Sequence, residues 1–227
     1  MTLFEKLYNI LIRDGSWKTI LGGLWVTVRI SLFALILGTL IGAAVCLLRT
    51  RKNRFVRGAA KVYIAVLRGT PVLMLLLLLY YGIFAGTGLS PVTVAVITFA
   101  LNVSAHVSEL MRASLEASDK GQIEAARVLG FTALDTFRLI TLPQVLRIAK
   151  PVYQSVIVNL IQWTSVVGYV TITDLTRVMN NTASRTMQPF LTILTGMLIY
   201  LAMSYIVFGI FALSDRISAK KRGGGVS

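Results

Sequence analysis

Charged side chains inside apolar stretches are the first candidates for chemistry in this sequence. Glu109 is the only acid within the long apolar runs, and Arg112 follows it at i+3, on the same face of a helix. A carboxylate facing lipid costs several kcal/mol, so Glu109 must be paired, protonated or in contact with water. Glu109 is therefore either half of a structural ion pair or a contact for a solute or gate. His106, on the same side, is either a packed, hydrogen-bonded residue or a ligand or proton relay.

A second polar group lies in a later apolar run. Gln162 and Trp163 are an amide and a large amphipathic ring among mostly aliphatic and small side chains. An amide can both donate to and accept from a zwitterion, and an indole face can hold a cation or an apolar group. Asn159 precedes Gln162 by three residues, so both share one helix face. With Thr164 and Ser165 they form a candidate solute path, and helix packing with one interhelical hydrogen bond is the alternative.

The residue patterns that support catalysis are missing. The sequence contains no metal-ligand cluster, no nucleophile and base pair and no phosphate loop, so we expect neither a catalytic residue nor a metal site. Because no Gly-Lys pair is present, a Walker A loop is excluded, and we expect no cofactor in this chain and no enzyme activity. Cys46 is the only cysteine, which excludes an intramolecular disulfide and a cysteine-based metal site.

The elements that must position these residues are transmembrane helices. With 56% hydrophobic and 14% charged residues, the chain carries more apolar surface than a soluble core of this size could bury. A helix needs about 20 residues to cross a hydrocarbon layer of about 30 Å. The runs that are long enough are 21–48, 62–86, 89–110, 151–173 and 189–213. The sequence therefore predicts an all-α polytopic membrane protein of about five transmembrane helices, with a transmembrane domain over residues 21–213.

Glycine and proline mark the ends and contacts of these helices. Gly86-Thr87-Gly88 predicts a tight turn that makes the second and third runs an antiparallel hairpin. Prolines lie near three expected helix starts, Pro151 among them, where the missing N–H costs nothing. Gly38 and Gly42 form a small-residue face on the first run that permits close helix packing.

Basic residues predict the orientation in the membrane. The connection between the first two runs has no acid, and its basic residues are Arg49, Arg51, Lys52, Arg54, Arg57 and Lys61. This connection and the basic tail, residues 214–227, are expected in the cytoplasm, so an odd number of crossings places the N-terminus outside. Residues 1–20 are interpreted as an amphipathic segment on the outer surface. The net charge of +14 is explained by these lipid-facing clusters, and nucleic-acid binding is not expected.

One large polar connection, residues 112–150, is expected on the cytoplasmic side. Asp119 followed by Gln122 resembles a capping box that starts a helix, and Gly130 is placed to end it. Thr132 is placed to start a second helix, which we expect to stop before Pro143. The connection is therefore predicted to be a compact helix-elbow-helix.

The first helix of this connection has a surface suited to a partner protein. Ala125 and Ala126 are small, so the backbone of a partner could approach closely. Glu124 and Arg127 flank them as polar anchors. We therefore expect this helix to bind another chain.

These residues resemble a family motif. The connection is similar to the EAA loop of ABC importer permeases, and the residues that carry the likeness are Gly121-Gln122-Ile123-Glu124-Ala125-Ala126, Leu129-Gly130 and Leu142-Pro143-Gln144. Arg68-Gly69-Thr70-Pro71 and the pair of Glu109 and Arg112 resemble further motifs of the polar amino-acid branch, the histidine/glutamine-type permeases with the type I importer fold. The likeness covers roughly residues 20 to 213.

The resemblance implies a transport subunit of a bacterial inner membrane that imports amino acids or related small polar solutes by alternating access. It implies a cytoplasmic ABC ATPase dimer that binds ATP and Mg, a second permease subunit (the same chain or a sister chain) and an extracytoplasmic solute-binding protein. The residues that it assigns to ATPase coupling are Gly121, Gln122, Glu124, Ala125, Ala126, Arg127 and Gly130.

The family pattern also has a departure, and other classes of protein stay open. Relatives commonly carry a Lys-Asp-Thr-Ser string where this chain has Gln162-Trp163-Thr164-Ser165, so the identity of the solute stays open. An ion-coupled secondary transporter is the main alternative, although such proteins generally show internal repeats and several intramembrane charges. A membrane scaffold without transport is a third reading, which the polar content of the fourth run disfavours.

Overall fold

The computed structural model describes residues 5, 8 and 15–223, in which every regular element is a helix. The chain divides into two compact units, one of residues 1–33, 72–98 and 157–227 and the other of residues 34–71 and 99–156. We call them unit 1 and unit 2 in this order. The expected surface segment, residues 1–20, lies largely outside the described residues, and from Ser16 onward it belongs to the first long helix.

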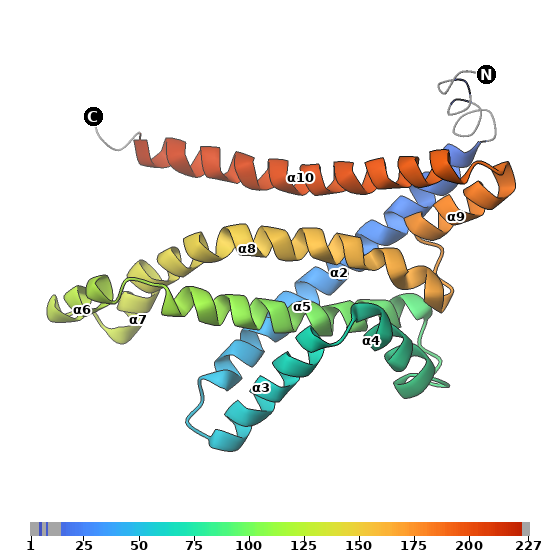
Figure 1. The fold of residues 1–227 in the computed structure, drawn as a ribbon. Helices are drawn as coiled ribbons and strands as arrows, with labels where there is room; N and C mark the ends of the chain where they lie inside the picture. Colours follow the sequence, from blue (N-terminus) through green and yellow to red (C-terminus); the bar gives the residue numbers. More distant parts are fainter. Residues whose placement is uncertain (1–4, 6–7, 9–14, 224–227) are drawn as a thin grey trace. The chain divides into compact units, whose positions relative to one another are not determined.

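Three helices are long and apolar enough to cross a membrane alone (Figure 1): α2 (Ser16–Arg49), α5 (Pro91–Glu116) and α10 (Pro189–Gly223). Two bent pairs pass the same test when each is taken together. One pair joins α3 (Arg54–Gly69) to α4 (Val72–Leu78) and η2 (Leu79–Ile83), and the other joins Ala133–Val170 to α9 (Leu175–Thr186). Counting each pair as one span gives up to five spans among the described residues, which confirms the predicted all-α membrane fold.

Proline residues set several of the helix boundaries. Pro91 and Pro189 are the first residues of α5 and α10, as predicted. The second span is broken after Gly69, because Thr70 precedes Pro71 and takes an extended conformation, with φ −101° and ψ 132°.

Two predictions about prolines in the fourth span are wrong, because Pro143 does not stop a helix and Pro151 does not lie near a helix start. The helical segments follow one another directly: α7 (Ala133–Thr136), the π-helical η3 (Phe137–Thr141) and α8 (Leu142–Trp163). In η3 the Leu142 N–H donates to the Phe137 carbonyl five residues earlier. This wider turn accommodates the ring of Pro143, which a regular helix would bring against the preceding turn. Pro151 lies inside α8, where it removes one backbone hydrogen bond.

Several helices extend beyond the predicted ends of the apolar runs. Helix α5 continues to Glu116 and α8 begins at Leu142, so both helices extend into the predicted connection, residues 112–150. Helix α10 continues to Gly223, and the first part of the expected tail, residues 214–227, is therefore helical, while residues 224–227 lie outside the described part. The reason is that an apolar run ends where charges begin, whereas charged residues such as Glu, Lys and Arg can continue a helix.

Close helix packing in unit 2 depends on two glycines. A Cβ atom at Gly38 of α2 would lie 2.7 Å from the Val103 Cβ and 2.8 Å from the Ala100 carbonyl oxygen of α5. A Cβ atom at Gly42 would lie 2.8 Å from the Ser104 carbonyl oxygen. Real Cβ contacts are essentially never this short, so the predicted small-residue face is confirmed as a packing surface.

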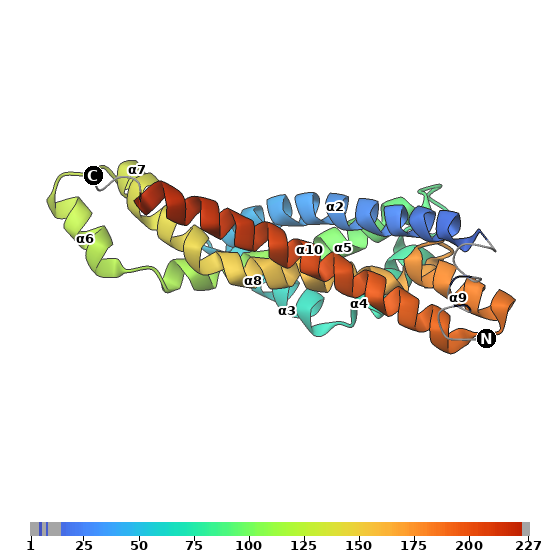
Figure 2. The same ribbon diagram turned by 90° about the horizontal axis from the view of Figure 1, so that it is seen from above.

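The core of unit 1 is formed around α9. Both Figure 1 and Figure 2 show α9 beside the first turns of α10, and its buried residues Leu175, Val178 and Met179 cluster with Ile20 of α2. The helix is started by Asp174, a fully buried residue whose carboxylate accepts hydrogen bonds from the backbone N–H groups of the first turn. This cap turns the chain back after η4 (Thr164–Val170), a 3₁₀ helix.

Candidate functional site

The helix expected to bind a partner, α6 (Lys120–Val128), is fixed at both ends by its own sequence. At its start, the Asp119 carboxylate accepts from the N–H groups of Gly121, at 2.9 Å, and Gln122, at 3.4 Å. At its end, Gly130 has φ +86°, the left-handed conformation that glycine adopts without strain. The Phe131 N–H then reaches back to the Ala126 carbonyl at 3.1 Å, which closes a Schellman motif.

One half of the predicted capping box is replaced by a contact with α8. In a capping box the Gln122 side chain would accept a hydrogen bond from the Asp119 N–H. Here the side-chain oxygen of Gln144 accepts that hydrogen bond instead, at 2.9 Å. The Gln144 amide nitrogen in turn donates to the Gln122 side-chain oxygen at 2.7 Å. Gln144 therefore ties the start of α6 to the start of α8.

The exposed face of α6, which we define as Glu124, Ala125, Val128 and Leu129, is the surface available to a partner. Val128 is 87% exposed and Leu129 77% exposed, which is unusual for aliphatic side chains on so short a helix. The other predicted coupling residues that are exposed are Gly121, Gln122, Arg127 and Gly130. Ala126 is only 2% exposed. The Ala126 methyl group packs inside its own unit, so Ala125 is the exposed one of the two alanines.

Glu109 forms an ion cluster, as the first of its two readings predicts. One carboxylate oxygen pairs with Arg112, one turn along α5, and the other pairs with Arg49, the last residue of α2. The Arg112 Nε donates to Glu109 Oε1 at 3.0 Å, and its NH1 also pairs with Glu116. Arg49 was not anticipated as a partner. Since both oxygens of the carboxylate have cationic donors, the cluster favours a clamp between two helices over a solute contact.

His106 lies on the same helix and forms a hydrogen bond one turn away. Its ring Nδ1 lies 3.0 Å from the Asn102 carbonyl oxygen, one turn earlier in α5. The Asn102 side chain donates across to the Leu67 carbonyl oxygen of α3 at 2.9 Å. These contacts hold α5 against α3 and favour a packed, hydrogen-bonded His106.

The candidate solute residues of the fourth span are only partly brought together. Asn159 and Gln162 are both exposed on one face of α8, which we call the α8 polar face, while Trp163 is half-buried. Thr164 is fully buried and donates to the Ile161 carbonyl at 2.6 Å, so it does not share that face. Ser165 lines a pocket at the start of η4. The face thus leads along the helix towards this pocket.

The pocket, which we call the η4–α9 pocket, has a volume of about 530 Å³ and lies entirely within unit 1. Its lining residues are Ser165, Val166, Gly168, Tyr169, Thr176, Arg177, Asn180 and Asn181. The Arg177 NH1 crosses from α9 to donate to the Gly168 carbonyl at 2.5 Å. The Tyr81 hydroxyl of η2 donates to the next carbonyl, that of Tyr169, at 3.3 Å. The end of η4 is therefore held by side chains from two other helices.

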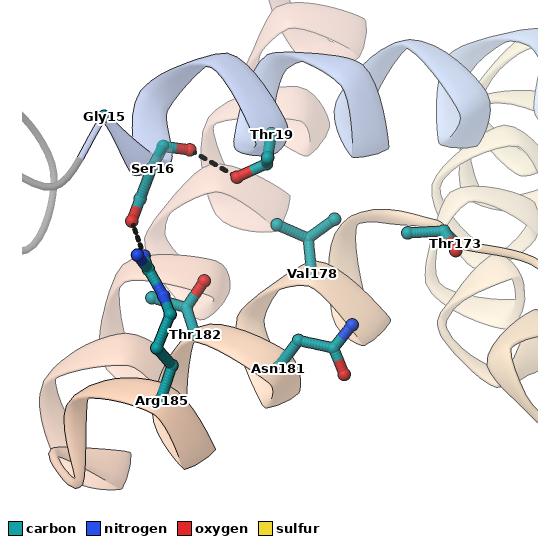
Figure 3. Close-up of a pocket in the computed structure, with 8 residues that line it drawn as sticks. All are labelled: Gly15, Ser16, Thr19, Thr173, Val178, Asn181, Thr182 and Arg185. Carbon is teal, nitrogen blue, oxygen red and sulfur yellow. Dashed lines mark hydrogen bonds between the residues drawn. The ribbon is translucent and has the colours of Figure 1, made fainter.

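A second pocket, of about 360 Å³, lies between the start of α2 and α9 (Figure 3). Arg185 reaches across it to the Ser16 hydroxyl, and the Thr19 hydroxyl donates to the Ser16 carbonyl at 2.8 Å. Asn181 lines this pocket as well as the η4–α9 pocket. Among the described residues, no group of three or more His, Cys, Asp or Glu side chains could hold a metal ion.

Comparison with known proteins decides the class. Residues 23–219 match the family described as the inner membrane component of binding-protein-dependent transport systems. The chain belongs to this family. The permease is 36% identical over 173 residues to the "Probable amino-acid ABC transporter permease protein YckA" of Bacillus subtilis strain 168, a match that covers 76% of each chain. It is 30% identical to the nopaline transport system permease protein NocM of Agrobacterium fabrum, over 88% of each chain.

Solved structures agree with this placement. The permease resembles a chain in the crystal structure of an amino acid ABC transporter with histidines, with 29% identity and a TM-score of 0.83, over 95% of this chain and 99% of the other. The inward-facing MetNI methionine ABC transporter shares the fold, with 19% identity and a TM-score of 0.73, over 88% of this chain and 94% of the other.

Family membership establishes what kind of component the permease is. It is the inner-membrane permease subunit of an ABC importer, a transport component whose ATPase activity belongs to separate subunits. The ion-coupled alternative is not supported.

Sequence reasoning missed the polar face of α9, because this helix lies between the apolar runs 151–173 and 189–213 and not within one. Leu175, Val178, Met179 and Thr182 recur with helical spacing after that acidic cap, which is the pattern of an amphipathic helix. The pattern places Arg177, Asn180 and Asn181 together on the opposite side, where they line the η4–α9 pocket.

Proposed function

We propose that the permease moves amino acids or related small polar solutes into a bacterial cell by alternating access. Two observations support this. The relatives YckA and NocM are, by name, permeases for an amino acid and for nopaline. The α8 polar face also carries two exposed amides on a helix that crosses the membrane, where polar groups are expensive and tend to mark solute pathways. Within this path, Asn159, Gln162, Trp163 and Ser165 contact the solute, and Thr164 supports the helix from inside.

The partner ATPase moves the permease through the exposed face of α6. The observation that carries this proposal is the exposed pair Val128 and Leu129 on a helix that is capped at both ends and bonded to α8 through Gln144. A helix held this firmly transmits movement rather than bending. A groove of a cytoplasmic ATPase subunit covers the pair, and Glu124, Ala125 and Arg127 flank the contact. Nucleotide-driven closure of the ATPase dimer, which binds ATP and Mg, then shifts the permease between its two states.

The assembly and orientation follow from the same proposal. A second permease subunit, either a copy of this chain or a sister chain, completes the transmembrane pathway, and an extracytoplasmic binding protein delivers the solute. The N-terminus and α9 lie outside. The basic connection between α2 and α3 lies in the cytoplasm, and α6 lies there too, because Arg49 at the end of α2 pairs with Glu109 near the end of α5. The basic charge of the C-terminal tail places it on the same side of the membrane.

Gentle isolation of the permease from its native membrane tests the proposal. An ABC ATPase should co-purify with the tagged chain, in about one ATPase per permease subunit, and addition of the solute-binding protein should stimulate ATP hydrolysis by the complex. Mass spectrometry and an ATPase assay are the measurements. A control chain that lacks residues 120–131 should insert into the membrane but retain no ATPase. The proposal is wrong if the control retains the same ATPase in the same amount.

A further inference from the structure

The η4–α9 pocket has the chemistry of an anion site, and its central residue is Arg177. The guanidinium donates one N–H to the Gly168 carbonyl, at 2.5 Å, and makes no other hydrogen bond within the described residues. An arginine side chain offers five N–H donors in a planar fork, a geometry that matches a carboxylate. The bond to Gly168 therefore fixes the direction of the fork and leaves most of its donors available.

The other polar groups of the pocket can recognise the rest of a small solute. Asn180 and Asn181 are exposed on the next turn of α9, and each amide can both donate and accept. Ser165 faces them from η4. Gln162 and Asn159 of the α8 polar face lie about one and two helical turns before Ser165 in the chain, so two exposed amides precede the pocket within unit 1.

No acid lines the pocket, so its formal charge is positive. Asp174 lies directly behind this lining, since a Cβ atom at Gly168 would be 3.7 Å from its Oδ1, but it is fully buried. Its oxygens accept from the N–H groups of Thr176, at 3.0 Å, and Arg177, at 3.1 Å, and lie 3.5 Å from the Tyr200 hydroxyl of α10. The next charged residue of α9, Arg185, points into the second pocket, where it bonds to Ser16 (Figure 3). A cationic side chain entering the pocket would thus meet the Arg177 guanidinium, whereas the nearby Asp174 carboxylate is buried and already accepts hydrogen bonds.

We propose that Arg177 holds the carboxylate of the transported solute, and that the permease prefers amino acids or derivatives of neutral or negative net charge to cationic ones. This inference rests on the proposed import function and adds the substrate class. The volume of about 530 Å³ is within the range of small-molecule sites. The simpler role, in which Arg177 only caps the end of η4, needs one donor and no charge.

Two variants separate these roles. Arg177→Gln keeps a donor for the Gly168 carbonyl but removes the charge and the fork, and Arg177→Lys keeps the charge but removes the fork. Arg185→Gln is the matched control, since it removes one cation from the same helix outside the pocket. In the assembled transporter with its binding protein, the KM for solute uptake should rise about tenfold or more in Arg177→Gln and less in Arg177→Lys. It should stay unchanged in Arg185→Gln, while the thermal midpoint should be the same in all three.

Chemical protection tests the carboxylate directly. Phenylglyoxal, which modifies guanidinium groups, is applied to the complex with each of the twenty common amino acids, and labelling of Arg177 and Arg185 is read by mass spectrometry. At least one neutral or acidic amino acid should slow labelling of Arg177 but not of Arg185. Its carboxamide should give no protection, and arginine and lysine should protect less.

The inference is overturned if no amino acid protects Arg177, if the carboxamide protects equally, or if the cationic amino acids protect best. ATP-driven uptake with an unchanged KM in Arg177→Gln would also overturn it and leave the import function intact, whereas an absence of ATP-driven uptake in the unmodified complex would refute the import function itself.

Discussion

The double variant Gly38→Ala, Gly42→Ala should lose the packing of α2 against α5 and unfold at a clearly lower temperature. Each added methyl group would lie 2.7 to 2.8 Å from Val103 or from a carbonyl oxygen of α5. Backbone atoms cannot rotate away as a side-chain end can, so the two helices must separate. Overpacking of this kind costs roughly 1 to 3 kcal/mol at each site. Thermal unfolding in mild detergent, followed by loss of the monodisperse peak in size-exclusion chromatography, is the measurement.

Gly22→Ala provides the matched control for this prediction. Gly22 lies on the same helix, and a Cβ atom there would have no atom within 4 Å. Because alanine is a better helix former than glycine, the control should be neutral or slightly stabilising. An equal loss of stability in both variants would show that helix composition, and not the close contact, determines the effect.

The second large effect is expected at the exposed face of α6. In the variant Val128→Ser, Leu129→Ser the partner contact loses two aliphatic side chains, each contributing about 1.5 kcal/mol when it is fully buried. The affinity for the ATPase should therefore fall about 100-fold. The capping bonds of α6 involve neither side chain, so the helix itself should persist. Titration of the purified ATPase against the permease in nanodiscs measures the affinity.

Leu139→Ser is the control for this variant. Leu139 is 63% exposed on η3 and is not part of the exposed face of α6. It should bind the ATPase with unchanged affinity. If the α6 variant also keeps its full affinity, the exposed face of α6 does not meet the ATPase, and contact with the lipid surface becomes the better explanation for these two side chains.

Local signals in the sequence were sufficient for much of the fold. The acidic cap at Asp119 and the glycine at position 130 bound α6, because both act through backbone groups a few residues away. The turn at Gly86 and Gly88, both with φ +75°, was predictable for the same reason. The spans followed from apolar length, although their ends did not, since a helix continues into charged sequence until a breaker stops it.

Contacts between distant residues were not predictable from the sequence. Arg49 pairs with Glu109 across 60 positions, and no local pattern distinguishes it from the other basic residues beside it. Gln144 displaces the Gln122 side chain from the predicted capping box for the same reason. The π-helical turn before Pro143 depends on the helix being continued on both sides, which single-residue rules do not reveal.

Reconstitution of the permease into vesicles tests the central claim, that a partner ATPase drives the permease through α6. Uptake of solute from added binding protein is measured with the ATPase and ATP, with the ATPase and a non-hydrolysable analogue, and without the ATPase. We expect sustained uptake only in the first case, and none when Val128 and Leu129 are replaced by serine. Concentrative uptake by the permease alone, driven by an ion gradient, would contradict the account.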